Sequence, residues 1–193
     1  MNKKQLLTTL LLSFSFMNVS YAEPSEQETI DYIEAKSSSC EDSTFNDKDE
    51  HGAIVLAIQT SMKINNKMLV VHELTDGLWA RYTGVRSLSS RESENRSWAM
   101  LQDLSSDISI KNGSTISLMC NSVNCFQTKN RHRTKWLDHE ESTRPLGEWG
   151  EWEEESSSNS KQFYTFCDAE GAQKIAKALS HLIKLNGGKT ELF

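Results

Sequence analysis

The sequence predicts a mainly β domain, an antiparallel barrel of about seven strands with flanking helices and a C-terminal amphipathic helix as its cap. Two observations predict it. Short runs rich in Val, Ile and Leu alternate with turn-forming pairs such as Asn112-Gly113, and the last long segment carries apolar residues at helical spacing. Because that segment follows seven or eight expected strands, we expect its helix to cover an open end or edge of the barrel.

Composition narrows the class of protein. The chain has 193 residues, with 21 Lys and Arg against 27 Asp and Glu and a net charge of −6. This length suits one domain, which we place at residues 23–193. The acidic balance argues against a nucleic-acid partner, since such a binder needs a basic surface. After the N-terminal segment, no apolar run approaches the length of about 18 residues that spans a membrane.

Residues 1–22 are typical of a Sec-type signal peptide. They contain two lysines near the start, an apolar stretch over 6–17, and small residues at Ser20 and Ala22. We expect cleavage after Ala22 and a bacterial protein that is periplasmic or secreted. A membrane anchor is the less favoured alternative, because the apolar stretch is short and the small-residue site follows it directly.

Both expected helices have recognisable ends. Ser25 and Glu28 form a capping-box pattern for a helix over about 25–37. Asp168 is a good N-cap for a helix over about 168–186, in which apolar residues follow the i, i+3, i+4, i+7 pattern of one helix face. The expected apolar face consists of Ala172, Ile175, Ala176, Leu179, Leu182 and Ile183.

Strands are expected between the helices, with turns at Asn65-Asn66, Asp76-Gly77 and Asn112-Gly113. The polar stretch 87–96 is interpreted as a connection between strands. Residues 130–160 lack a convincing period and are interpreted as a long insert. The expected strands are 53–59, 67–74, 78–85, 97–101, 108–111, 114–120, 125–129 and 162–166.

The four cysteines are expected to form disulfides, because export places them in an oxidising compartment. Four cysteines allow three pairings. Cys120 and Cys125 flank a four-residue loop in an expected hairpin, where opposed residues lie within disulfide reach. Cys40 and Cys167 would then be the second pair. There is no Cys-x-x-Cys spacing for a metal, and the sequence indicates no cofactor.

The 130–160 insert is the expected binding segment. It begins basic, with Arg131 and Arg133, turns acidic, and carries Trp149 and Trp152 three residues apart. Exposed tryptophans usually mark a contact surface. Three interpretations stay open: the tryptophans close the core, they contact a partner or ligand, or the insert is disordered.

Four stretches carry a resemblance to a known group of proteins: residues 29–36, residues 101–110, residues 116–120 with Cys125-Phe126, and residues 172–188. Together they resemble uncharacterised exported bacterial proteins with a pleckstrin-homology-like barrel. The resemblance covers about half of residues 23–193 and implies a bent seven-stranded barrel capped by the C-terminal helix. It implies little about the ligand, because that fold hosts lipid, peptide and protein binding.

No catalytic motif is recognised, so we expect a non-catalytic binding or adaptor domain that contacts an envelope protein through the 130–160 insert. One alternative is a binder of a small ligand or of cell-wall glycan, with Trp149 and Trp152 stacking on it. A less favoured alternative is an envelope hydrolase that uses Asp138 and His139. The sequence leaves the oligomeric state open.

Overall fold

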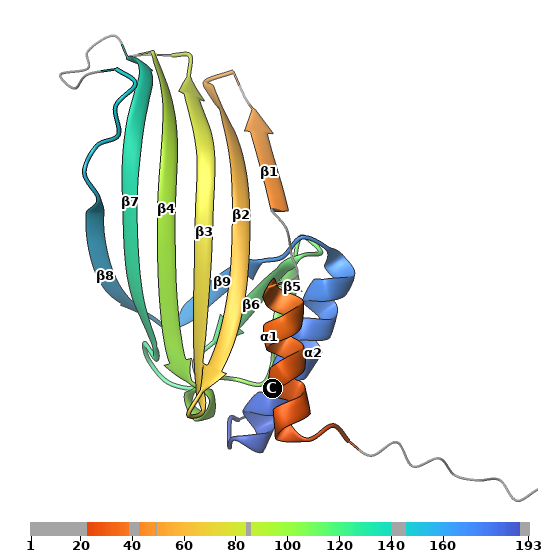
Figure 1. The fold of residues 1–193 in the computed structure, drawn as a ribbon. Coiled ribbons are helices and arrows are strands. Elements are labelled where there is room, and N and C mark those ends of the chain that lie inside the picture. The colour runs from red at the N-terminus through yellow and green to blue at the C-terminus, as the bar shows by residue number, and fades with distance from the viewer. Residues whose placement is uncertain (1–22, 39–42, 49, 84–85, 140–145, 190–193) are drawn as a thin grey trace, which may run out of the picture.

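A six-stranded antiparallel sheet forms the body of the protein in the computed structural model, which describes residues 23–38, 43–48, 50–83, 86–139 and 146–189 (Figure 1). Its strand order is β1-β2-β3-β4-β7-β8. Four of the strands have 14 residues each, a length of about 46 Å. The strands are β1 (Ser43–Lys48), β2 (Gly52–Asn65), β3 (Met68–Arg81), β4 (Ser87–Met100), β7 (Phe126–His139) and β8 (Glu153–Asn159).

A smaller layer packs at one end of this sheet (Figure 1). It contains the three-stranded sheet β5-β6-β9 and two helices. We call the sheet half beside this layer proximal and the other half distal. The elements are α1 (Glu26–Ser38), the 3-10 helix η1 (Leu101–Asp103), β5 (Ser109–Lys111), β6 (Thr115–Met119), β9 (Lys161–Thr165) and α2 (Ala169–Leu185).

The described strands do not close into a barrel. β1 and β8 each pair on one side only, so the large sheet ends in two edges. The mainly β class with a C-terminal helix is therefore confirmed, whereas the expectation of a closed barrel is wrong. The reason is long-range pairing: β4 bonds to β7, and the segment between them leaves to form the second sheet.

Both helices begin as the sequence predicts. The Glu28 carboxylate accepts a hydrogen bond from the Ser25 N–H at 2.8 Å, and Ser25 Oγ accepts one from the Glu28 N–H at 3.3 Å. Asp168 caps α2 by accepting from the Gly171 N–H. α1 also covers the proximal edge of β2, where Ser37 Oγ accepts from the Met62 N–H at 2.9 Å.

The core lies between the proximal half of the large sheet and the smaller layer. The sheet face that turns toward this layer is called the inner face, and the opposite one the outer face. Hydrogen bonds between the two sheets include one that Thr60 donates to the Thr165 carbonyl at 2.8 Å and one between the Ser97 and Tyr164 hydroxyls, which lie 2.5 Å apart. Fully buried apolar side chains include Ile33, Met62, Leu69, Leu101, Leu104, Ile116, Leu118, Phe126, Phe166, Ile175 and Leu179.

β3 replaces two expected strands, and the turn expected at Asp76-Gly77 is wrong. Gly77 lies inside β3, where a Cβ atom would come 2.8 Å from the Trp79 ring and 2.5 Å from Leu56 Cδ2. The glycine therefore serves close packing, since its missing side chain lets the Trp79 ring lie against the backbone.

Two polar stretches also form strands against expectation. The segment 87–96, interpreted as a connection, belongs to β4, and much of the 130–160 insert belongs to β7 and β8. β1 was not expected at all. Single-sequence periodicity misses these strands because their side chains are polar on both faces or lie at an edge. Of the expected hairpin turns, Asn112-Gly113 is confirmed by its positive φ angles, and the β2–β3 turn falls one residue later, at Asn66-Lys67.

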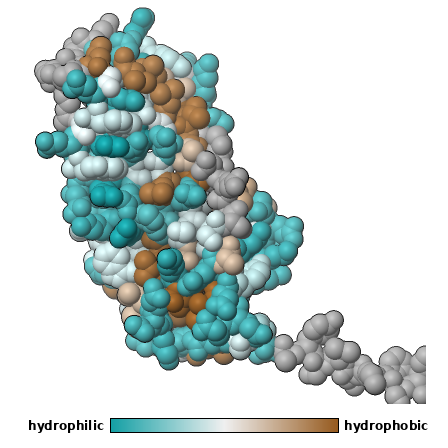
Figure 2. Space-filling model, in the orientation of Figure 1, coloured by the Kyte–Doolittle hydropathy of each residue, from teal (hydrophilic) through white to brown (hydrophobic). Residues whose placement is uncertain are grey.

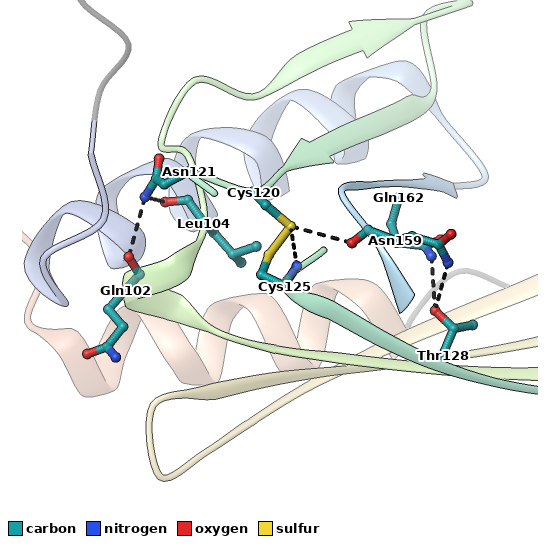
Figure 3. Close-up of a disulfide and its surroundings, with 8 residues drawn as sticks. All are labelled: Gln102, Leu104, Cys120, Asn121, Cys125, Thr128, Asn159 and Gln162. Carbon is teal, nitrogen blue, oxygen red and sulfur yellow. Dashed lines mark hydrogen bonds between the residues drawn. A yellow bond between two sulfur atoms is a disulfide. The ribbon is translucent and has the colours of Figure 1, made fainter. Parts of the chain in front are cut away.

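The disulfide between Cys120 and Cys125 is confirmed (Figure 3), but the hairpin expected to hold it is wrong, because β6 and β7 belong to different sheets and the bond closes the loop between them. The two Cα atoms lie 5.7 Å apart, and the Cys125 N–H donates to Cys120 Sγ at 3.0 Å. Asn121, inside the loop, donates to the Leu104 carbonyl at 2.7 Å and so anchors the loop beside η1. Cys40 lies outside the described residues, as do residues 1–22, so the Cys40–Cys167 pairing and the signal peptide remain predictions.

The disulfide provides a stability prediction. Replacing Cys120 and Cys125 together by Ser should lower the free energy of unfolding by about 2 kcal/mol, because a short closed loop restricts the unfolded chain only modestly. Urea denaturation under oxidising conditions measures the change. The same titration under reducing conditions is the control, since there the native protein should lose its advantage; equal stability of the two proteins in oxidising buffer would contradict the prediction.

Candidate binding surfaces of the large sheet

The distal half of the large sheet is a single layer with apolar side chains on both faces. Residues 53–58 of β2 are six consecutive apolar residues, and none of them is fully buried. Ile54 and Leu56 point to the inner face, whereas Val55 points to the outer face and is 42% exposed. A continuous apolar run is typical of strands covered on both faces. The distal half therefore presents contact surface on each side.

The outer face carries an apolar patch over the distal ends of β2 and β3. Val55 and Leu78 are cross-strand neighbours with exposures of 42% and 41%. Figure 2 shows hydrophobic colouring there and mostly hydrophilic colouring over β7 and β8. We call this surface the outer patch; it consists of Ala53, Val55, Leu78, Ala80 and Leu88.

Beside the outer patch, alternate residues of β7 stack with two tryptophans. The Arg133 guanidinium lies 4.7 Å from the centre of the Trp149 ring and 4.8 Å from that of Trp152. Arg131 lies 4.9 Å from the Trp152 ring, and Lys135 lies 4.8 Å from the Trp149 ring. These five residues form a Trp–Arg ladder along the outer face.

Backbone hydrogen bonds attach the tryptophan segment to the edge of β7. The Gly147 N–H donates to the Trp136 carbonyl at 2.7 Å, and the Gly150 N–H donates to the Thr134 carbonyl at 2.9 Å. The structure thus brings together the four residues of the expected binding site, Arg131 and Arg133 with the two tryptophans. Of the three interpretations of the insert, core closure is wrong, because both tryptophans lie on the sheet surface and Trp152 is 40% exposed.

Most charges of the outer face neutralise one another. Glu94, with only 10% of its side chain exposed, accepts hydrogen bonds from Arg131 and from His72 at 2.8 Å and lies 3.1 Å from Arg96. Arg133 pairs with Glu92 at 2.5 Å. Desolvation opposes ionisation of Glu94, but the bonds from Arg131 and His72 outweigh it and hold the pKa of the carboxyl below its ordinary value.

Glu94 therefore supports a mutational prediction. Glu94→Gln should lower the free energy of unfolding by about 1 to 3 kcal/mol at pH 7, because an uncharged amide leaves its cationic neighbours without a carboxylate. Since the folded-state pKa is depressed, this stabilisation is present above the unfolded-state pKa and is lost as the pH falls through the folded-state value. Thermal and urea unfolding at pH 7 and pH 3 measure both effects.

Glu154→Gln is the matched control. Glu154 pairs with Lys129 at 2.9 Å on the same face, but half of each side chain is exposed. Its replacement should change the free energy of unfolding by less than about 1 kcal/mol. Equal losses in the two variants would contradict the role given to Glu94.

The inner face of the distal half is hollowed into a trough of about 520 Å³. Ile54 and Trp79 form one side and Trp136 the other, with Arg91 and Ser89 from β4 between them. The sequence analysis missed this site. Its one available signal was the continuous apolar run 53–58. The lining residues of β4 and β7 are far from this run in the sequence, and only the pairing of the strands brings them beside it.

The structure does not bring Asp138 and His139 together. They are consecutive in β7, so their side chains point to opposite faces. The His139 ring instead packs edge-on against Trp136, with ring centres 4.5 Å apart. Among the described residues, no three His, Cys, Asp or Glu side chains form a metal-binding group.

One titratable group of the inner face was also missed. Burial raises the pKa of Glu73 to about 7. Hydrogen bonds from Asn95 and Thr60, each at 3.3 Å, and from the Thr165 backbone lower this pKa but do not outweigh burial. A raised carboxyl pKa can mark an active site. Glu73, however, lines none of the described cavities and lies under β9, so its position indicates a structural role.

The raised pKa of Glu73 leads to a prediction about how stability depends on pH. Because its folded-state pKa is raised, ionisation destabilises the fold between the ordinary value of 4.5 and about 7. Glu73→Gln should therefore gain stability relative to the native protein as the pH rises from 5 to 8, by up to about 3 kcal/mol. Urea unfolding at several pH values measures this. Asp76→Asn, on the outer face of the same strand, controls for the loss of one acidic charge; a pH-independent difference for Glu73→Gln would contradict the prediction.

Together these features define, over the described residues, an open antiparallel β protein with two α-helices and a distal sheet half that none of its other elements covers. In comparisons with known proteins, no family model, curated protein or solved structure matches the chain. The pleckstrin-homology-like resemblance therefore remains a proposal. Within the described part of the chain, no helix is long and apolar enough to cross a membrane.

Proposed function

We propose that this protein is a non-catalytic binding domain that docks a partner protein on the outer face of its large sheet. The observation that carries the proposal is the exposed cross-strand pair Val55 and Leu78 in a patch that no described element covers. Soluble monomers rarely expose a contiguous apolar area without using it for contact. The outer patch and the Trp–Arg ladder lie side by side on this face, and together they form the proposed docking surface.

The shape of this surface favours a protein over a small molecule. Small ligands bind in concave sites, whereas the outer patch lies on the face of an extended sheet. Aromatic residues and arginine are enriched at the centres of protein interfaces. The ladder adds rigidity, because Trp149 and Trp152 are already held by cations and lose little freedom on binding.

The same contacts weigh against glycan as the ligand. Each ladder tryptophan already contacts two cationic side chains, so its ring is engaged within the protein. The hydrolase alternative loses support because Asp138 and His139 lie on opposite faces.

The expected cellular context is the bacterial envelope or the exterior. The Cys120–Cys125 disulfide supports this, since structural disulfides persist in oxidising compartments. The proposed partner is therefore an exported or envelope protein with an apolar surface that complements the outer patch.

Site-specific photo-crosslinking tests the proposal. A photoreactive amino acid at position 78, in the outer patch, should crosslink a defined protein in cells that export this chain, as read by mass spectrometry. The same amino acid at position 123 is the control, because Val123 is 83% exposed but lies in the turn before β7, at the proximal end. No adduct at position 78, or the same adducts at both positions, would overturn the proposal.

Substitutions then test the surface itself. Val55→Ser should reduce the crosslink at position 78 at least about fivefold, and Trp149→Ala with Trp152→Ala should reduce it similarly, because hot-spot truncations cost more than about 1 kcal/mol of binding. Val123→Ser should leave it unchanged. Circular dichroism verifies folding. A crosslinked dimer of this chain as the sole adduct would identify self-association and contradict a separate partner.

A further inference from the structure

The inner trough has the dimensions of a small-molecule site. Its volume of about 520 Å³ falls within the range of roughly 300 to 1,000 Å³ that ligand pockets occupy. It lies on the opposite face of the sheet from the outer patch. Side chains of β2, β3, β4 and β7 line it, so a rigid scaffold positions the site.

The distinctive group in the trough is Arg91. Its Nε atom is buried and has no hydrogen-bond partner, and the Arg91 side chain takes part in none of the ion pairs formed by the described residues. Three other arginines of β4 and β7 are paired: Arg96 and Arg131 with Glu94, and Arg133 with Glu92. These three point to the outer face, whereas Arg91 points to the inner one.

A partly buried cation without a counterion is costly, because it loses hydration and gains no charge partner. In the protein alone, the Arg91 guanidinium has the Trp79 ring, whose centre lies 5.8 Å away. Gly77, opposite Arg91 in the β3–β4 pair, brings no side chain between them. A ligand anion would supply the missing charge and the missing acceptor.

The remaining lining residues indicate the chemistry of the uncharged part of such a ligand. Ile54, Trp79 and Trp136 offer apolar and aromatic surface on both sides of Arg91. Among the described residues, Asp47 is the one carboxylate that lines the trough. It is on β1, separated from β4 by β2 and β3 and therefore by about 14 Å. The other charged or titratable groups of the described lining are Arg81 and His51, and both are exposed. Arg91 is partly buried, so an anionic head gains most beside Arg91.

We propose that this trough binds a small amphipathic carboxylate, whose charged head pairs with Arg91 and whose apolar body lies against Ile54, Trp79 and Trp136. This ligand site is independent of the proposed docking of a protein on the outer face.

Three compounds with apolar chains of nine or ten carbons and different heads test the charge requirement: decanoate, decanol and decyltrimethylammonium, each below its micelle concentration. Isothermal titration calorimetry measures binding, and tryptophan fluorescence reports contact with the trough. Decanoate should bind at least about tenfold more tightly than either of the others, because a charge-assisted pair forms only with the carboxylate. Equal affinities for the three compounds, tighter binding of decanol, or no binding of decanoate would overturn the proposal.

Arg91→Gln tests the residue. It should weaken decanoate binding about tenfold or more and leave decanol binding nearly unchanged, since only the charged contact is removed. Arg96→Gln is the matched control, because it removes a cation from the outer face of the same strand and should leave decanoate affinity unchanged. Unchanged decanoate affinity in Arg91→Gln would contradict the role of Arg91.

Two further measurements separate a ligand site from a structural role. Without ligand, Arg91→Gln should unfold at the same temperature as the native protein or higher, because it removes an unpaired charge. If this variant does not fold, Trp136→Leu replaces it and should also weaken decanoate binding. The photo-crosslink at position 78 should persist in Arg91→Gln, so failure of the ligand site and failure of the docking surface give different results.

Discussion

The large sheet of this protein is longer than the layer that covers it, and this mismatch governs the rest of the structure. Strands of 14 residues extend for about 46 Å, whereas the covering strands have three to five residues and α2 has 17, a length of about 25 Å. A buried core forms only where the two layers overlap. Burial there is complete for side chains such as Leu69, Phe126 and Leu179, and it supplies most of the stabilisation of the fold.

Outside the core, in the distal half and on the outer face, the sheet is stabilised within its own plane. Trp79 fills the space above Gly77, the ladder packs Trp149 and Trp152 on alternate cations of β7, and Glu94 gathers three basic neighbours on the outer face. These contacts join neighbouring strands rather than opposite layers. They explain how a single-layer sheet keeps its order while leaving an apolar strand, β2, accessible from both sides.

The two accessible faces differ in shape and charge, and this difference separates the two proposed binding modes. The outer face is an extended apolar surface beside charges that are already neutralised, which suits a macromolecular partner. The inner face is concave and holds an arginine that pairs with no described carboxylate, which suits a small anion. Alternation along β2 places Val55 on the first surface and Ile54 on the second, so one strand serves both.

The sequence by itself determined the features that depend on neighbouring residues. The Ser25 and Asp168 caps, the Asn112-Gly113 turn and the Cys120–Cys125 disulfide each involve groups within a few positions of one another, so local stereochemistry decides them. It also indicated Arg131, Arg133 and the two tryptophans as a group. Only the tertiary structure decided the rest. β4, β7 and β8 are too polar to reveal a strand period. The pairing of β4 with β3 and of β7 with β4 extends the sheet and assembles the trough around Arg91. Such contacts join residues dozens of positions apart, so cooperative sheet pairing creates them and no local pattern encodes them.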